Sequence, residues 1–118
     1  MLLSKDQILN ANDYEYEDIE VKEWGGTVRV RTMSGTERDN FEASVFESKG
    51  KDTKVNFKNF RAKLCAMTIV NEENMRMFTD SEVEDLGKKS AKALDKVFNV
   101  AQKLNGIGAK EVEELTKN

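Results

Sequence analysis

The sequence predicts an α+β fold in which one N-terminal β-hairpin packs against four or five α-helices. Three observations support this prediction. Two short segments of alternating apolar residues flank a Gly-Gly pair, three capping boxes mark helix starts, and two later segments carry apolar residues at helical spacing. The length of 118 residues fits a single domain. We place that domain at residues 1–108 and expect residues 109–118 to form a C-terminal tail.

The predicted hairpin comprises residues 16–23 and 27–32, joined by a two-residue turn at Gly25-Gly26. Glycine readily adopts the positive φ angles that such a turn requires. One face of the hairpin is apolar and carries Ile19, Val21, Val28 and Val30. The other face is charged, and its expected cross-strand pairs join Glu20 and Lys22 to Arg29 and Arg31. Because a lone hairpin is marginal in water, helices must cover the apolar face.

Three helices are predicted from capping boxes. In this motif a Ser or Thr side chain accepts a hydrogen bond from the backbone N–H three residues later, and the Glu or Gln at that position reaches back. The pattern occurs at Ser4 and Gln7, at Ser34 and Glu37, and at Thr79 and Glu82. The helices that follow are expected to end near residues 11, 48 and 86. Residues 49–52 are read as a polar loop after the second helix.

Two further helices are predicted from apolar spacing. Residues 57–70 carry an apolar stripe at helical spacing, and neighbouring apolar residues widen it until most sides of the helix are apolar. We therefore expect a buried helix. This stripe comprises Phe57, Phe60, Leu64 and Met67. Residues 68–70 are also compatible with a strand. Residues 91–104 follow the potential cap Ser90, have lysines on the opposite side, and end at Asn105-Gly106, where glycine supplies a left-handed cap. Their stripe comprises Leu94, Val97, Phe98, Ala101 and Leu104.

The residue inventory argues against an enzyme. The chain has no histidine, which removes the commonest general base and the usual nucleophile pairs and zinc sites. Its one cysteine, Cys65, lies in an apolar stretch typical of core packing. No acidic pair has the apolar flanks that raise a carboxyl pKa. We therefore expect no catalytic, metal-binding or cofactor-binding residue, and no cofactor.

Composition also bears on location and on nucleic acid. No apolar run approaches the roughly 18 residues of a membrane span, and the first residues lack the apolar block of a signal peptide. We therefore expect a cytoplasmic protein without a membrane partner. The second half of the chain is only slightly basic, and no arginines alternate with aromatic residues there. Nucleic-acid binding is not expected.

Charge is unevenly distributed along the chain, with an acidic first half and a slightly basic second half. We predict that an acidic surface of one copy meets a basic surface of the next, which would build a ring or a filament. The acidic candidates are Glu15, Glu17, Asp18 and Glu20. The basic candidates are Lys92, Lys96 and Lys103, or alternatively Lys54, Lys58 and Arg61. The competing interpretation is that these charges pair within one chain.

Three apolar residues are candidates for binding a partner: Trp24, Val112 and Leu115. Trp24 at the hairpin turn either covers the core or makes an exposed contact, since an indole N–H favours a wet edge. Residues 109–118 either form a last helical turn or two, with Val112 and Leu115 inward, or are disordered.

The order of three segments resembles a known family. Residues 20–39 (EVKEWGGTVRVRTMSGTERD) combine a strand, a Trp-Gly-Gly turn, a second strand and a helix start. Residues 78–80 (FTD) and 86–106, which include LGKKS and LDKVFNVAQKLNG, follow later. Together they resemble the tail assembly chaperones of long-tailed (siphovirus-type) bacteriophages and prophages, over about residues 15–108. Where relatives often carry glycine in the turn before the FTD segment, this chain has Asn74, which tolerates the same backbone.

This resemblance implies a non-enzymatic chaperone that binds the tape measure protein, keeps it soluble and helps to recruit the major tail tube protein. It also implies action in the cytoplasm of the bacterial host, absence from the mature virion, and a longer form made by frameshifting near the C-terminus. The alternative is another phage morphogenesis or interaction adaptor, such as a head-tail connector.

Overall fold

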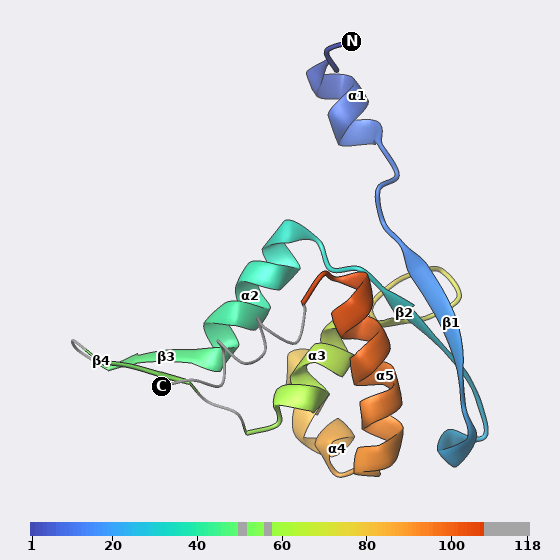
Figure 1. Ribbon diagram of the computed structural model, residues 1–118, viewed down its shortest axis with the longest axis vertical. Coiled ribbons are helices and arrows are strands. Elements are labelled where there is room, and N and C mark those ends of the chain that lie inside the picture. The colour runs from blue at the N-terminus through green and yellow to red at the C-terminus, as the bar shows by residue number, and fades with distance from the viewer. Residues whose placement is uncertain (50–51, 56–57, 108–118) are drawn as a thin grey trace.

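The computed structural model describes residues 1–49, 52–55 and 58–107, and it confirms the α+β fold. Its sheet has three antiparallel strands in the order β1-β2-β5. These strands are β1 (Tyr16–Val21), β2 (Gly26–Arg31) and β5 (Ile69–Val70). Two helices, α3 (Phe60–Thr68) and α5 (Ala91–Leu104), pack against each other, and α5 also packs against the hairpin (Figure 1).

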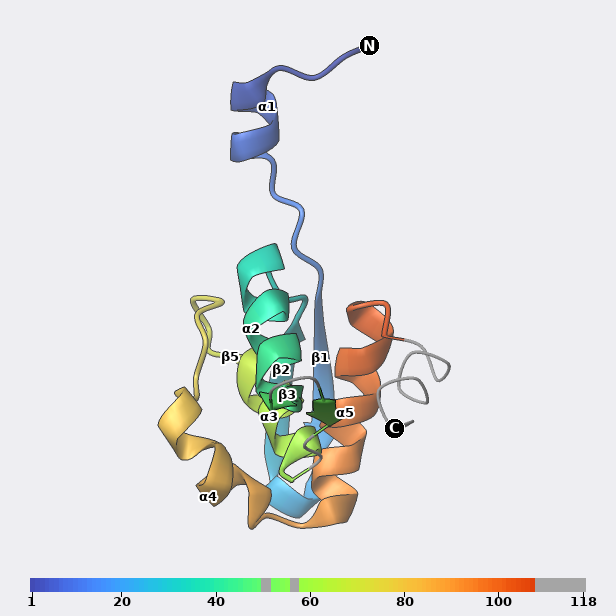
Figure 2. The same ribbon diagram turned by 90° about the vertical axis from the view of Figure 1, so that its left-hand side faces the viewer.

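The remaining elements extend outward from this centre. The helix α1 stands clear of the rest of the molecule in both views (Figures 1 and 2). A second hairpin, β3 with β4, follows α2 and forms its own two-stranded sheet. The bounds of these elements are α1 (Lys5–Asn10), η1 (Lys22–Trp24), α2 (Gly35–Val45), β3 (Phe46–Lys49), β4 (Asp52–Val55), η2 (Asp80–Glu82) and α4 (Val83–Gly87).

The first hairpin forms where it was predicted, but its turn and its charge pairs differ. The connection is the 3-10 turn η1 followed by Gly25, whose φ of 75° is left-handed. Asp18 therefore lies opposite Arg29, Tyr16 opposite Arg31, and Glu20 opposite Thr27. The expected pairs of Glu20 and Lys22 with the two arginines are wrong. The partner of Arg29 has moved by four residues, from Lys22 to Asp18, and this even shift keeps each side chain on its predicted face because side chains alternate with a period of two.

Two other predictions about secondary structure need correction. The second helix was expected to reach residue 48, but α2 ends at Val45 and the chain continues as β3. β3 pairs with β4 in the register Phe46 opposite Val55, and the pairing extends to Lys49 and Asp52, the two ends of the expected polar loop. The central helix ends at Thr68, and the strand interpretation of the next residues is correct, since Ile69 pairs with Val30. Phe57 lies outside the described residues.

The predicted helix caps are present. Ser4, Ser34 and Thr79 each head a capping box, and in the second the Glu37 N–H donates to Ser34 Oγ at 3.1 Å while Glu37 Oε1 accepts from the Ser34 N–H at 2.8 Å. The end of α5 is a Schellman motif: the Ile107 N–H donates to the Gln102 carbonyl at 2.8 Å, and Gly106 has a φ of 67°.

The core lies between the hairpin, α3 and α5. Val21 and Val30 from the sheet, Leu64 from α3, and Val97 and Ala101 from α5 are fully buried. Cys65 is also buried, and removal of its thiol from water raises the pKa to about 12, so the group stays protonated at neutral pH. The cysteine is therefore a core residue, as predicted.

Candidate interaction surfaces

The acidic candidates lie on or next to β1, and one of them is already paired. Glu17, Asp18 and Glu20 are exposed on β1, and exposed Glu15 precedes it. Asp18 receives two hydrogen bonds from Arg29 on β2, from Nε at 2.8 Å and from Nη2 at 3.2 Å. These bonds lower the pKa of the Asp18 carboxyl. Within the described part of the chain, the other three carboxylates form no ion pair.

The basic candidates divide in the same way. Lys96 on α5 donates to Glu23 Oε1 in η1 at 2.8 Å, and this hydrogen bond lowers the pKa of Glu23. Arg61 on α3 pairs with Asp95 on α5 at 2.6 Å. Both pairs tie elements of one chain together. The exposed Lys92 and Lys103 form no ion pair among the residues described at 1–49, 52–55 and 58–107. Exposed Lys58 precedes α3, and Lys54 lies in β4.

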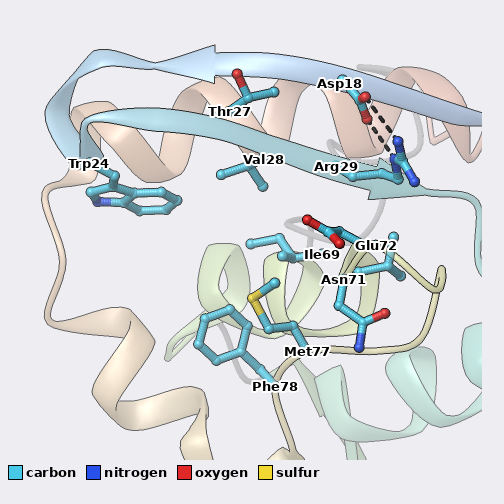
Figure 3. A pocket seen from close by; sticks show the side chains of 11 residues that line it. Asp18, Trp24, Thr27, Val28, Arg29, Ile69, Asn71, Glu72, Met77 and Phe78 are labelled. Atoms are coloured by element: carbon cyan, nitrogen blue, oxygen red, sulfur yellow. Dashed lines mark hydrogen bonds and ion pairs between the residues drawn. The ribbon is translucent and has the colours of Figure 1, made fainter.

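Sequence reasoning missed an apolar groove beside the hairpin. It has a volume of about 420 Å³ and lies between β2 and the loop after β5 (Figure 3). Its apolar lining comprises Trp24, Val28, Ile69, Val70, Met77 and Phe78. The polar residues Asp18, Thr27, Arg29, Asn71 and Glu72 complete it. Trp24 is half-buried, so it packs on the core and lines this groove at the same time. The sequence signal was Trp24, the candidate contact at the hairpin turn, whereas nothing in the sequence connected residues 75–78 with it.

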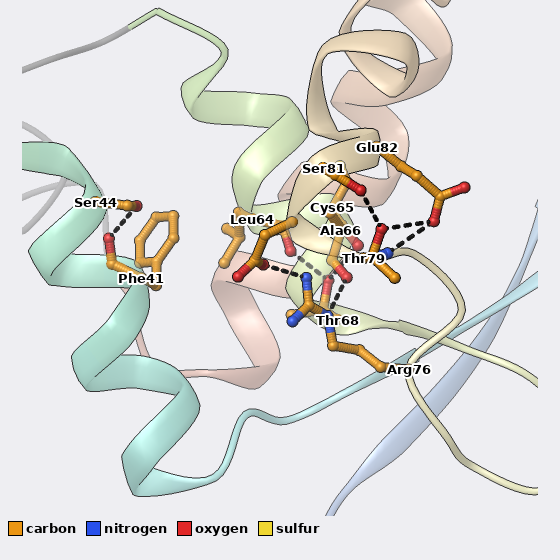
Figure 4. Close-up of polar contacts among 11 residues, drawn as sticks. Phe41, Ser44, Leu64, Cys65, Ala66, Thr68, Arg76, Thr79, Ser81 and Glu82 are labelled. Atoms are coloured by element: carbon orange, nitrogen blue, oxygen red, sulfur yellow. Dashed lines mark hydrogen bonds and ion pairs between the residues drawn. The ribbon is translucent and has the colours of Figure 1, made fainter.

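The loop bordering this groove is held by polar contacts. Arg76 donates from Nε to the Ala66 carbonyl at 2.9 Å, near the end of α3, and from Nη2 to Asp80 at 2.7 Å (Figure 4). The Asn71 side chain accepts hydrogen bonds from the backbone N–H groups of Glu73 and Met75, both at 3.0 Å. Asn74 has a φ of 63°, the left-handed backbone that asparagine tolerates. These hydrogen bonds hold in place the loop that forms one wall of the groove.

Asn105 is another residue whose role the sequence did not reveal. Its side-chain oxygen accepts from the Met33 N–H at 2.6 Å, and its carbonyl accepts from Arg38 Nη1 at 2.7 Å. The end of α5 is therefore fixed both to the segment between β2 and α2 and to α2 itself. The sequence identified this asparagine only as part of a helix end.

The residues that the structure describes also bear on membrane spans and metal sites. None of their helices is long and apolar enough to cross a membrane. Among the same residues, no three acidic or cysteine side chains converge as a metal site requires. Val112 and Leu115, the two tail candidates, lie outside the described residues.

Comparisons with known proteins point to one family. A family model described as phage tail assembly chaperone matches residues 4–118. Among solved structures, the chain is similar to the tail assembly chaperone of bacteriophage HK97, with a TM-score of 0.59 and 16% sequence identity. The match covers 84% of this chain and 90% of that chain, and at this identity it shows a shared fold. No curated protein matches the sequence.

Proposed function

Because the chain belongs to the phage tail assembly chaperone family, we propose that it binds the tape measure protein of a long-tailed phage, keeps it soluble and helps to recruit tail tube subunits. The observation that carries this proposal is the family match over residues 4–118. The protein works by binding and catalyses no reaction. It acts in the cytoplasm of the bacterial host and leaves before the virion is complete.

A chaperone that must later leave should bind weakly at each site and gain strength from many copies. The exposed charges suit this requirement, because surface ion pairs contribute only about 0.2–1 kcal/mol each. Asp18, Lys96 and Arg61 already have partners within the chain. The proposed contact between copies therefore uses the remaining carboxylates near β1 and the lysines Lys92 and Lys103.

Light scattering across a salt series tests this charge contact. At about 1 M salt the screening length falls to ~3 Å, so oligomers held by these charges should become smaller than at low salt. An oligomer of equal size under both conditions would show that the charges do not join copies.

Co-expression tests the chaperone proposal. The tape measure protein is produced alone, with this chain, and with an unrelated soluble protein of similar size as the control. We expect it in the soluble fraction only with this chain, and we expect the two proteins to copurify. Equal solubility in all three cultures would contradict the proposal.

A further inference from the structure

The N-terminal arm, residues 1–15, presents large apolar side chains to solvent. Its helix α1 buries no residue, and the exposed fractions of Leu2, Leu3, Ile8 and Leu9 are 97%, 61%, 58% and 72%. The helix has six residues, whereas an isolated helix in water needs about 12–15 to be even marginally stable. A capped helix this short, with exposed leucines, requires a surface on which to pack.

The arm is directed away from its own body. Glu15 is fixed to the sheet by two hydrogen bonds, from its N–H to Thr32 Oγ1 at 3.1 Å and from the Thr32 N–H to its carbonyl at 3.0 Å. Beyond α1, Ala11 has an extended backbone with φ −67° and ψ 136°. Figures 1 and 2 show the helix well clear of every other element. The arm can therefore reach a second molecule.

The groove beside β2 offers the matching surface. Its lining is mostly apolar, and Met77 within it is 52% exposed. At its edge, Arg29 is already paired with Asp18, whereas Glu72 forms no ion pair within the described part of the chain. The arm carries a lysine, Lys5, in the first turn of α1. Asp6 stands beside Lys5 in the same turn, so the arm and the groove are complementary chiefly in apolar character, with Lys5 as the cation that can approach Glu72.

We propose that α1 of one copy docks in the groove between β2 and the 71–78 loop of a second copy. Leu2, Leu3, Ile8 and Leu9 cover the apolar lining, including Trp24, and Lys5 approaches Glu72. Each copy has one arm and one groove, so the contact is head-to-tail and extends to further copies. It rests on the proposed self-association and adds an apolar contact that salt does not screen.

Mixed disulfide cross-linking tests which molecule receives the arm. Two variants, Ile8→Cys and Met77→Cys, are mixed under mild oxidation; buried Cys65 does not compete. We expect a dimer containing one chain of each variant. The control pairs Ile8→Cys with Lys89→Cys, which is exposed and outside the groove lining. No dimer above this control would overturn the proposal, and so would an equal yield from Ile8→Cys alone, which would show arm-to-arm contact.

The double variant Ile8→Cys/Met77→Cys distinguishes the second copy from the arm's own chain. We expect cross-linked oligomers at concentrations where the unmodified protein associates. A cross-linked monomer as the sole product would show that the arm folds back into its own groove, and the proposal would fail.

Sedimentation at about 1 M salt provides a second test, because charge contacts are then screened. The variant Ile8→Glu/Leu9→Glu should associate at least about tenfold more weakly than the unmodified protein. Asn10→Glu, on the same helix, is the matched control and should associate normally. Since α1 buries nothing in its own chain, both variants should keep the same melting temperature. Unchanged association of the Ile8→Glu/Leu9→Glu variant would refute the proposal without bearing on tape measure binding.

Discussion

The ion pair between Glu23 and Lys96 shows how single residues fix the hairpin to the helices. It joins η1 at the hairpin turn to the middle of α5, two places 73 residues apart in the chain. The side chains are 25% and 39% exposed, so water screens the pair only in part. Because the hydrogen bond from Lys96 favours the charged carboxylate, the pKa of Glu23 is lowered in the folded state.

This pair predicts part of the acid sensitivity of the protein. Glu23 has a folded-state pKa below its ordinary value of 4.5. Its contribution to stability is therefore present above that pH and is lost as the pH falls through the folded value. We expect Glu23→Gln to lower the urea midpoint slightly at pH 6 and to leave it unchanged at pH 2. Glu84→Gln, at an exposed position of α4, is the control. Equal losses for Glu23→Gln at both pH values would contradict this role.

At the scale of elements, the helix ends marked by a capping residue were the most predictable features. Capping depends on residues close together in the sequence, so Ser4, Ser34, Thr79 and Ser90 could all be identified in advance. The bounds of α5 agree with the predicted helix at both ends. The local sequence was sufficient to predict each cap, because a capping residue contacts only the first or last turn of its own helix.

The C-terminal cap of α5 gives a stability prediction. Gly106 has a φ of 67°, and although a Cβ there would meet no atom within 4 Å, an alanine would adopt a strained backbone. We expect Gly106→Ala to lower the free energy of unfolding by about 1 kcal/mol. Gly35→Ala, in the first turn of α2 without a positive φ, should be neutral or slightly stabilising. Urea denaturation of both variants measures their free energies of unfolding. Equal changes at the two positions would be inconsistent with strain at Gly106.

The strands were less predictable, because pairing depends on residues far apart in the sequence. The helix pattern before Ser48 gave no sign that Phe46 would pair with Val55. In retrospect, a glycine-containing turn followed by β-branched Thr53 and Val55 was the available signal. Similarly, the strand at Ile69–Val70 exists because β2 offers an edge to pair with.

The interaction surfaces were also only partly predictable, because they too depend on residues far apart in the sequence. Charge order along the chain identified exposed carboxylates near β1, but it did not reveal that Lys96 and Arg61 pair internally, since this requires the packing of α5 against η1 and α3. The groove was invisible for a related reason. Its walls come from the hairpin and from the 71–78 loop, which meet only in the folded chain.

At the scale of the whole molecule, the body and its extensions have different roles. The sheet, α3 and α5 form a core that needs no partner, whereas the N-terminal arm and the groove remain available for other chains. A contact made through a six-residue helix belongs to the weak class of interfaces. Several weak contacts of this kind suit a coat that forms on a long protein and is later displaced.

Truncation tests whether the tail belongs to this body. Deletion of residues 109–118 should leave the fold intact, because only Val112 and Leu115 offer sizeable apolar side chains there. Thermal unfolding followed by circular dichroism measures the effect. A fall in the melting temperature of more than about 10 °C would mean that the tail is part of the core.

The central claim is that many copies bind one tape measure protein reversibly along its length. The most direct measurement is the mass of the purified complex, determined by light scattering, for the full-length tape measure protein and for a version shortened by half. We expect the number of chaperone copies to fall by about half with the shortened partner. The same small number of copies on both partners would contradict the claim, because it would indicate one local site instead of a coat.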